Sequence, residues 1–354
     1  MRNTTTSTIL LLTLLAVNAV NLLGQAGKAS GSGRQIINID FPGATYTAAL
    51  AINDAGVITG TYLDTSNVFH GFLRKADGTM ISFDPTSSNQ TQGLAINSIG
   101  QIAGYYGTAA GKVYSFVREV GGTFITIDPS GDGRASFPAW IDDSGNVSGE
   151  GSDSRGYYHA FTDIDNVITL FDPPSSIIYL DDAYYLNNGE VVGTFQGENG
   201  VLQGYIRDAL GNYTIIVAPG AGSKRAGEGT WAFKMNASGT IVGFCTDEHL
   251  ASRGYLRNQD GSFAKIEAPG AGTGLFQGTY PQDINDAGQV IGARVGTNTS
   301  AFLRNPSGTI TLFNAPGAGQ GKGQGTAALR INSGGIIIGQ YIDANNVYHA
   351  FLMY

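Results

Sequence analysis

The side chains that could do chemistry are few, and most of them recur at a regular spacing. Three of the four histidines, His70, His159 and His349, occupy one position of a repeated unit. Histidine is a common metal ligand, but a metal ion needs its ligands within roughly 2 Å. The same position in the other units holds Tyr114, Gln203, Arg253 and Ser300. Because equivalent positions of different units lie far apart, we expect a structural column and predict neither a metal nor a cofactor.

A second candidate is a nucleophile at the single cysteine. Cys245 stands four residues before His249, with Glu248 between them. A cysteine–histidine pair can attack carbonyl groups, but it needs a third group to orient the base, and none is identifiable. We therefore predict no catalytic residue here. A lone cysteine also excludes an internal disulfide, so stability must come from burial. Four aspartates follow a repeat glycine by four residues and are interpreted as turn-opening residues: Asp64, Asp153, Asp247 and Asp343.

The repeat that positions these residues is clearest in the segment from Ala51 to Gly60, Ala-Ile-Asn-Asp-Ala-Gly-Val-Ile-Thr-Gly. An apolar residue, an Asn or Asp and two glycines return in the same order around Asn97, Asp142, Asn187, Asn236, Asn285 and Asn332. Successive final glycines are 44, 45, 44, 50, 49 and 47 residues apart. A period of this size indicates a solenoid, a propeller or an array, since one unit cannot bury its own apolar face.

Each unit reads as four short strands separated by turns. In the first unit the strands are predicted at 50–52, 57–62, 68–74 and 80–83, with Asn53 to Gly56 as a hairpin turn. A proline follows each predicted fourth strand and ends the ladder, since proline donates no hydrogen bond. These prolines are Pro42, Pro85, Pro129, Pro173, Pro219, Pro269 and Pro316.

The two ends of the chain complement each other. The last unit stops at Tyr354 after its third strand, whereas Gln35–Phe41 is a fourth strand without a unit of its own. Pairing the two would remove an exposed sheet edge. We therefore predict an all-β, seven-bladed β-propeller with four antiparallel strands per blade, closed by the N-terminal strand completing the last blade.

An aromatic column accompanies the histidine column. In every unit a large ring follows a small residue, which favours packing between units. The rings are Phe72, Phe116, Phe161, Tyr205, Tyr255, Phe302 and Phe351.

The first 26 residues predict export. Arg2 precedes the apolar run Ile9–Val17, and small residues at Ala19, Gly24 and Ala26 offer cleavage sites, so we predict a signal peptide at 1–26. The alternative is an uncleaved N-terminal anchor. Residues 27–33 form a flexible leader, and 34–354 form a single domain. We expect a secreted or periplasmic monomer without membrane insertion of the mature chain. With a net charge of −8 and no run of basic residues, we expect no nucleic-acid partner.

The His-Ala-Phe triplets at His159 and His349, with His70-Gly71-Phe72 and the Ile-Asn-Asp-x-Gly motifs, resemble the HAF family of probable bacterial extracellular repeat proteins. The resemblance covers nearly all of the chain after Arg34. It implies export and a propeller-like array but no established activity. The fourth unit departs from the pattern, because its Asn187-Asn188-Gly189 turn is one residue short.

Function in repeat folds is expected where the units differ. Two columns vary in or just before the predicted first strands, where aromatic rings, charges and amides suit a saccharide or a peptide. Longer glycine-rich connectors in the last three units carry Lys224, Arg225, Phe276 and Lys322. The predicted ligand-binding residues, expected at one rim of a central funnel, are Phe137, Trp140, Asp182, Tyr185, Trp231, Lys234, Tyr280, Asp283 and Arg330. Both tryptophans could equally pack beneath loops.

The sequence favours a secreted, non-catalytic propeller that binds a saccharide or a protein. The first alternative is a propeller enzyme, a glycoside hydrolase or polysaccharide lyase. Its acids would be Asp181, Asp182 and Asp283, and a two-carboxylate mechanism needs a separation of roughly 5–9.5 Å. The second alternative is a structural protein of the cell surface, since a fold alone never fixes a function.

Overall fold

A computed structural model describes residues 27–28, 34–185, 189–197 and 199–354. Side chains are described throughout these ranges except at 27–28 and 177–185. The predicted signal peptide and residues 29–33 of the predicted leader lie outside them. The described residues form strands and loops, and none of them belongs to a helix long and apolar enough to cross a membrane.

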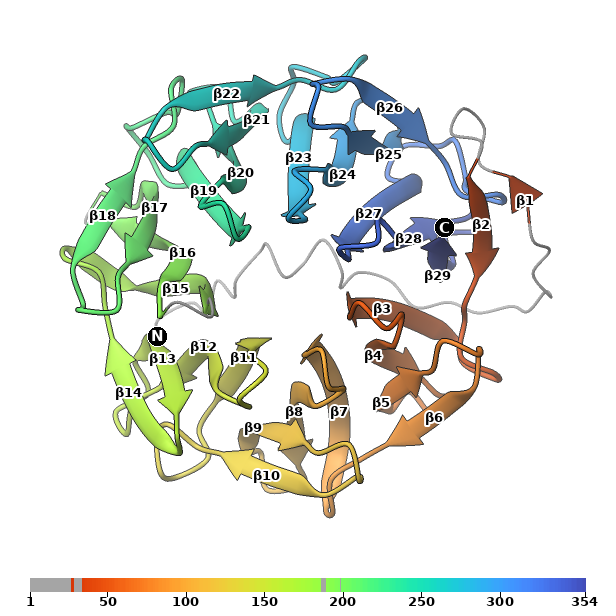
Figure 1. Cartoon of the computed structure of the whole chain (residues 1–354), viewed down its shortest axis with the longest axis vertical. Helices are drawn as coiled ribbons and strands as arrows, with labels where there is room; N and C mark the ends of the chain where they lie inside the picture. The colour runs from red at the N-terminus through yellow and green to blue at the C-terminus, as the bar shows by residue number, and fades with distance from the viewer. Residues whose placement is uncertain (1–26, 29–33, 186–188, 198) are drawn as a thin grey trace, which may run out of the picture.

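The strands are arranged in a ring around a central axis (Figure 1). The strands nearest the axis are β3 (Tyr46–Ile52), β7 (Ser88–Ile96), β11 (Ser136–Ile141), β15 (Ser176–Tyr185), β19 (Gly229–Met235), β23 (Gly278–Ile284) and β27 (Gly325–Ile331). Each is followed outward by a second strand: β4 (Ile58–Leu63), β8 (Ile102–Thr108), β12 (Val147–Ser152), β16 (Val191–Gly197), β20 (Ile241–Thr246), β24 (Val290–Val295) and β28 (Ile337–Ile342).

Third and fourth strands complete the outward order. The third strands are β5 (Phe69–Arg74), β9 (Val113–Arg118), β13 (Tyr158–Ile164), β17 (Leu202–Arg207), β21 (Ser252–Arg257), β25 (Thr299–Arg304) and β29 (Tyr348–Met353). The outermost strands are β6 (Met80–Phe83), β10 (Phe124–Ile127), β14 (Val167–Phe171), β18 (Tyr213–Ile216), β22 (Phe263–Ile266), β26 (Ile310–Phe313) and β2 (Gln35–Asn38), and the short β1 (Gly27–Lys28) pairs with β2. The predicted strand order of the first unit is therefore confirmed, with small shifts at the ends.

Within each unit sequential strands pair antiparallel, but the ladders do not form one closed sheet. The strands from β3 to β14 make three separate four-stranded sheets, whereas those from β15 onward, with β1 and β2, make one 17-stranded sheet. Single parallel bridges join this larger sheet, from Leu202 to Gly229, from Ser252 to Gly278 and from Thr299 to Gly325. In these later units the residue before each first strand accepts from the preceding unit, as Glu228 O does from Leu202 N, and in the shorter connector before β11 Gly133 O accepts from Val113 N.

The two termini meet in one ladder, as the sequence predicts. In β2, Ile36, Ile37 and Asn38 pair antiparallel with Met353, Leu352 and Phe351 of β29. Around the axis each first strand contacts the next, and β27, the last, contacts β3. The ends of the chain are therefore joined by backbone hydrogen bonds as well as by packing.

A β-bulge recurs in the first strands, and it explains the repeat glycine. In β3 the pairing skips Leu50, so that Ala49 faces Gly60 and Ala51 faces Thr59. The same shift occurs before Ala95, Trp140, Lys234, Asp283 and Arg330. A Cβ atom on Gly60 would overlap the carbonyl oxygen of Ala48, which the bulge pushes inward. The recurring glycine is therefore required for close backbone approach.

The recurring turn asparagine links neighbouring units, a role beyond opening its own hairpin. Its Oδ1 accepts from the backbone four residues later, as at Val57, while its Nδ2 donates to the next turn. These donations run from Asn53 to Asn97 O (3.0 Å), Asn97 to Asp142 O (2.8 Å), Asn236 to Asn285 O (3.2 Å), Asn285 to Asn332 O (3.1 Å) and Asn332 to Asn53 O (3.1 Å). The last bond joins the final unit to the first.

The core lies between neighbouring groups of strands. Phe72, Phe116, Phe161, Phe302 and Phe351 are fully buried, which confirms the predicted packing role of the aromatic column. A Cβ atom on the small residue before Phe72 would meet the ring of Phe83. In this unit the small residue therefore makes room for the aromatic side chain of the outermost strand.

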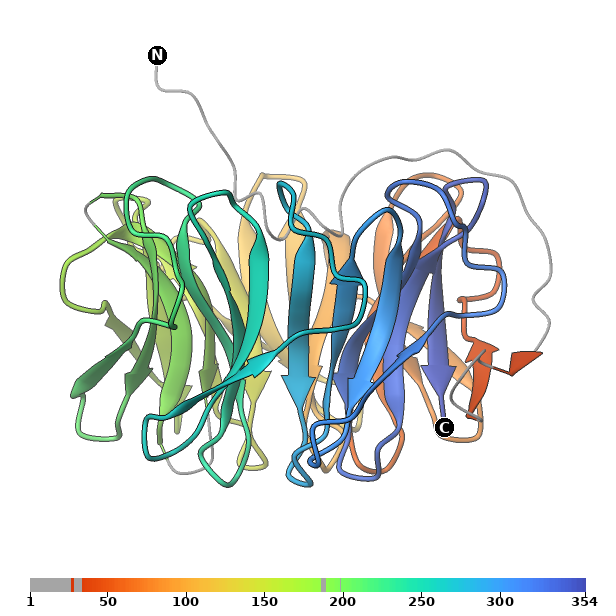
Figure 2. The ribbon, with the colours of Figure 1, turned by 90° about the horizontal axis from the view of Figure 1, so that it is seen from above.

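The ring has two faces with different loops (Figure 2). We call the lower one in Figure 2 the turn face, because the asparagine turns and the hairpins between third and fourth strands lie there. The upper one is the connector face, formed by the connectors between units and by the hairpins between second and third strands.

Candidate functional site

The predicted ligand-binding residues divide between the two ends of the first strands. Lys234 and Asp283 each lie one residue before the end of their strand, next to the turn face. The connectors with Lys224 and Phe276 enter those strands at the opposite end. Five residues of β-strand span about 17 Å, so these groups do not converge on one rim. The expectation that all predicted ligand-binding groups lie at a single rim therefore does not hold for Lys234 and Asp283.

Near the axis, residues from three units come together as the axial cluster, Trp140, Lys234 and Asp283. Lys234 Nζ lies 4.3 Å from the centre of the Trp140 ring and 3.6 Å from Asp283 Oδ1. Burial lowers the pKa of Lys234, and the nearby charge of Arg330 lowers it further, while Asp283 works in the opposite direction. Arg330 Nη1 donates to the Leu329 carbonyl. Two charged residues of the predicted site, Lys234 and Asp283, therefore do lie together, at the turn-face end of their strands.

Asp283 is a structural carboxylate. Only 2% of its side chain is exposed, its Oδ1 accepts from its neighbour's amide, Ile284 N, and its Oδ2 accepts from Ile331 N across to β27, each at 2.9 Å. Lys234 is its counter-ion, and both carboxylate oxygens of Asp283 already accept hydrogen bonds from the backbone. The side chains of Asp181, Asp182 and Tyr185 lie outside the described residues, so the carboxylate separation of the enzyme hypothesis stays untested.

The remaining aromatic residues of the predicted set are packed. Trp231 is 2% exposed and stacks near Phe233 and Phe244, so it belongs to the core. Tyr280 is half-buried, with its ring edge-on to Phe244 and its hydroxyl donating to Phe276 O. Phe137, also half-buried, lies edge-on to Tyr105. For Trp231 the packing interpretation of the sequence is the one observed.

Cys245 is not placed as a nucleophile. It is 2% exposed, and burial raises the pKa of its thiol to about 11. A thiol that keeps its proton at neutral pH is a weak nucleophile. The backbone amide of His249 is held by Asp247 Oδ1, in the turn-opening role predicted for that aspartate.

The histidine column forms hydrogen bonds with aspartates that sequence spacing alone did not reveal. His70 Nδ1 lies 2.7 Å from Asp84, and His349 Nδ1 lies 2.6 Å from Asp40 at the other end of the chain. His159 makes the same contact with Asp172 at 2.8 Å. The turn-opening aspartates lie 3.5–3.7 Å from the other ring nitrogen of each histidine. In the sequence, each of these pairs could have been found from the aspartate that follows the outermost strand of its unit.

These clusters are small and self-contained. Within the described parts of the chain, no three His, Cys, Asp or Glu side chains gather as they would around a metal ion. At His349, burial lowers the pKa, but the hydrogen bond and charge of Asp40 and the charge of Asp343 outweigh it, so the pKa lies above its ordinary value. The pair therefore ties β2 to β29 most strongly when the imidazole is charged.

A pocket of about 620 Å³ opens on the connector face. The Gly220–Lys224 connector forms one wall, and the hairpin with Glu248 and His249 forms another. We call it the connector pocket. It is also lined by Glu228, Asp247, Arg253 and Lys265. Its volume is within the range of small-molecule sites, roughly 300–1,000 Å³.

The connector pocket is held in shape by buried acids. Glu228 Oε2 accepts from Lys224 N at 2.8 Å, and its Oε1 accepts from Arg225 Nε at 3.0 Å. The bond from Lys224 N, with the charge of Arg225, lowers the pKa of Glu228 despite its burial. Asp247 Oδ2 accepts from Arg253 Nη2 at 2.9 Å. Sequence reasoning named Lys224 and Arg225 here but missed these partners.

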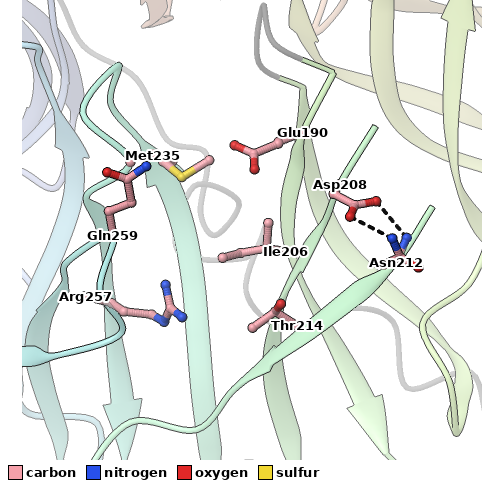
Figure 3. A pocket seen from close by; sticks show the side chains of 9 residues that line it. Glu190, Ile206, Asp208, Asn212, Thr214, Met235, Arg257 and Gln259 are labelled. Atoms are coloured by element: carbon pink, nitrogen blue, oxygen red, sulfur yellow. Dashed lines mark hydrogen bonds between the residues drawn. The ribbon is translucent and has the colours of Figure 1, made fainter. Parts of the chain in front are cut away.

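A second pocket, of about 290 Å³, lies on the turn face between β17 and β21 (Figure 3). Glu190 and Asp208 line one side, Arg257 reaches in from the other, and Ile206 and Met235 supply apolar surface. Both Asp208 oxygens bond to Asn212, as the dashed lines in Figure 3 show. We call this the turn pocket. Its charged lining residues are two acids and one arginine, whereas the connector pocket is lined by three acids and three cations.

Comparisons with known proteins identify the fold but no family. Neither the protein-family models nor the curated proteins searched give a match to the sequence. Among solved structures, the β-propeller domain of the Trilobed protease from Pyrococcus furiosus is similar at a TM-score of 0.59 and 11% identity, covering 87% of this chain and 94% of that one. Virginiamycin B lyase from Staphylococcus aureus follows at 0.57 and 12%, covering 91% and 99%.

Other similar structures are longer or more distant. The chain spans 63% of TolB from Acinetobacter baumannii, at a TM-score of 0.49 and 14% identity over 73% of this chain. A fungal lectin matches at 0.43 and 13%, covering 88% of this chain and 96% of that one. The last two scores are too low to carry an argument, and identities this low show the fold alone. The chain therefore has an all-β, propeller-like fold that proteins of several functions share.

Proposed function

We propose that this protein is an exported, non-catalytic binding protein that holds a saccharide or protein ligand on its connector face. The observation that carries the proposal is the connector pocket, whose walls are the long connector and hairpin that vary between units. Loops on a rigid scaffold are the usual place for recognition. Glu228 and Asp247 hold the walls of this pocket in place by hydrogen bonds. This favours binding, because little conformational entropy is lost when a ligand binds.

For the fold, we propose a seven-bladed propeller in which residues 34–354 form one domain. The sequential pairing of four strands, the contact of β27 with β3 and the pairing of β2 with β29 support this count. The bond from Asn332 to Asn53 supports closure at the turn face. We also propose that the chain is a HAF-type repeat protein, exported after cleavage of a signal peptide within 1–26.

The enzyme alternative has less support from the described groups. Asp283 is bonded to two backbone amides and a lysine, and Cys245 is a buried, protonated thiol. Neither group offers the exposed acid or nucleophile that a hydrolase or lyase needs. Residues of a binding surface need no such reactivity, since shape and hydrogen bonding suffice.

The proposal is tested by locating a bound ligand. We would screen the mature chain on a saccharide array and against purified cell-surface proteins, then map the best ligand by hydrogen–deuterium exchange. We expect protection in the connectors at 217–228 and 267–277. Protection confined to the turn-face hairpin at 208–212 would place recognition on the wrong face and contradict the proposal.

A pair of exposed apolar residues supplies matched variants. Phe276 on the connector face is 62% exposed, and Leu210 on the turn face is 89% exposed. We expect Phe276→Ser to weaken binding about tenfold, which corresponds to about 1.4 kcal/mol. Leu210→Ser should leave binding unchanged, because it alters the opposite face by a similar loss of apolar surface.

A further inference from the structure

An arginine ends the third strand in five of the seven units. Two of these side chains lie against an aromatic ring of the preceding unit's outermost strand. Arg118 covers the ring of Phe83 at 5.2 Å, and Arg207 covers that of Phe171 at 4.5 Å. The guanidinium can also donate to its own hairpin, as Arg118 Nη1 does to Glu119 O. The five arginines are Arg74, Arg118, Arg207, Arg257 and Arg304.

The third unit, β11 to β14, has an aspartate at the position of these arginines. Asp163 follows His159 by four residues, just as Arg74 follows His70. In the last unit the same position holds Met353, which is buried in the core. Among these seven positions, all of which lie within the described ranges, Asp163 is the acid. The third unit therefore places a carboxylate where five other units place a guanidinium.

Asp163 faces the second unit, β7 to β10. It pairs with Ile168 across its hairpin, and Phe161 pairs with Leu170 in the same ladder. Because side chains alternate along a strand, these four lie on one face, and on that face Phe161 and Leu170 pack with Ile127 of the second unit. The outermost strands β10 and β14 are neighbours on the circumference of the ring (Figure 1). We call the surface formed by Asp163, Ile168 and Ile127 the Asp163 junction.

The carboxylate at this junction is not compensated by a nearby donor. Asp163 Oδ1 is buried, and no described residue donates a hydrogen bond to it. Burial raises the pKa of this carboxyl group. The nearest arginine of the second unit in this column, Arg118, lies over Phe83 and so points toward the first unit. The turn-face loops of the third unit, 142–146 and 163–168, contain four aspartates and no Lys or Arg. A cation supplied from outside would therefore relieve the cost of a buried, unpaired oxygen.

Apolar side chains beside Asp163 are exposed. Ile168 is 38% exposed, whereas the residues paired with the five arginines are all half-buried. Ile125, on the same face of β10 as Ile127, is 46% exposed, and Val167 is 65% exposed. An arginine or lysine side chain has an apolar stem and a charged head, so it can cover such carbon atoms while its head meets a carboxylate.

We propose that the Asp163 junction binds an arginine or lysine side chain of a protein partner, which takes the place of the arginine that five other units carry. The inference goes beyond the proposed function, because it assigns a second site away from the connector face. The head of the partner's side chain makes a charge-assisted hydrogen bond to Asp163, and its stem packs on Ile168. The exposed Val167 extends the apolar surface, which favours a protein segment over a free cation. The net charge of −8 attracts a basic partner.

The test begins with an array of random 12-residue peptides, probed with the mature chain and with its Asp163→Arg variant. This variant restores the residue of the other units and fills the junction from within. We expect the peptides that bind the natural chain but not the variant to be enriched in arginine or lysine. If no such peptides were found, or if they were acidic or purely apolar, the inference would be overturned.

Affinity measurements with the best of these peptides locate the contact. Asp163→Asn should weaken binding at least about tenfold, because it removes the charge that pairs with the peptide. Asp165→Asn removes an exposed charge from the same hairpin and should change the Kd less than about twofold. Asp165 has a φ of 52°, which asparagine adopts as readily, so the hairpin is kept. Circular dichroism and melting curves would show that the variants remain folded.

A neutral peptide completes the cycle. Replacing the peptide's arginine by citrulline, or its lysine by norleucine, should weaken binding to the natural chain but leave the Kd for Asp163→Asn unchanged. An equal loss in both proteins would mean that the basic residue binds elsewhere, and an equal loss in Asp165→Asn would leave only general surface charge; either result overturns the inference. Spermidine that displaced the peptide at equal concentration would overturn it in favour of a small polyamine. Binding of a connector-face ligand should be the same in Asp163→Arg as in the natural chain, so this inference and the proposed function can fail separately.

Discussion

The two faces of the ring are built on different principles. On the turn face, the same Asn, Asp and Gly recur, and asparagine side chains donate to backbone carbonyls of the next unit, as from Asn332 to Asn53. On the connector face, connectors change in length, and their contacts combine backbone bonds, such as Leu202 N to Glu228 O, with side-chain pairs such as His349 with Asp40. The turn face thus holds the array together, while the connector face is free to vary.

This difference shows where a repeat protein can change without unfolding. A repeated bond from an asparagine side chain is costly to lose, since its loss leaves a buried polar group unpaired. A connector carries only its own interactions, so an insertion costs little more than loop entropy. Recognition is accordingly proposed on the face where substitution is tolerated. Four stability measurements test the contrast, from the largest expected effect to the smallest.

The largest effect is expected from glycines that look alike in sequence. Gly292→Ala places a Cβ atom against the Tyr280 carbonyl beneath the bulge, which should cost about 3 kcal/mol through backbone displacement. Gly270→Ala on the connector face has no atom within 4 Å of the new Cβ and suffers only the strain of its φ of 72°, about 1 kcal/mol. Urea unfolding of both variants measures the difference, and equal losses would refute the bulge explanation.

Two lysines give the next contrast. Lys234→Met leaves Asp283 charged and buried without its counter-ion, which should cost about 2–3 kcal/mol, since two backbone amides still compensate part of the charge. Lys224→Met removes a side chain that is 78% exposed and should change the unfolding free energy by less than about 0.5 kcal/mol. The double variant Lys234→Met with Asp283→Asn should recover part of the loss. No recovery would mean that packing against Trp140 dominates.

The asparagine links are expected to matter at about 1–2 kcal/mol each. Asn332→Ala removes the donor to Asn53 O and the acceptor for Ile336 N. Asn345→Ala, in an exposed hairpin of the connector face, removes only a 3.4 Å contact with Asp343 and serves as the control. Thermal melting compares them. If Asn345→Ala lowered the melting temperature as much, the turn face would have no special role.

The smallest effect depends on pH. The pKa of His349 is raised, so its contribution is fully present below the unfolded pKa of about 6.5 and is lost as pH rises through the higher folded value. We expect exchange of the β2 amides to accelerate beyond solvent catalysis at alkaline pH, by a change of about 1 kcal/mol. His349→Gln should remove this extra dependence. His159→Gln, which does not join the termini, should leave it unchanged.

Part of this molecule follows directly from its sequence. Period, turn residues and prolines predict the strand order, and the complementary ends predict the pairing of β2 with β29. Each of these features has a local cause or a fixed spacing. Bulges could not be predicted in this way, because a skipped residue such as Leu50 leaves no mark on the spacing of apolar residues.

The candidate site was harder to predict than the fold. Variation between units drew attention to Lys224 and to the connectors, but it could not separate Lys234, which lies near the axis at the opposite end of its strand. The repeat position of Trp231 differs between units as much as that of Trp140 does. The packing of Trp231 against Phe244 is what shows that Trp231 belongs to the core. Variability marks freedom from repeat constraints, not exposure.

The sequence by itself determined the repeat, the order of strands within it and the pairing of its two ends, because hydrogen-bonding periodicity and turn chemistry are local properties. Only the tertiary structure decided which charges meet. His349 pairs with Asp40 from the far end of the chain, Lys234 lies over Trp140, and the buried Glu228 pairs with the exposed Arg225. Burial and distance set the interaction energy between two charges, and both are fixed only when strands remote in sequence pack together.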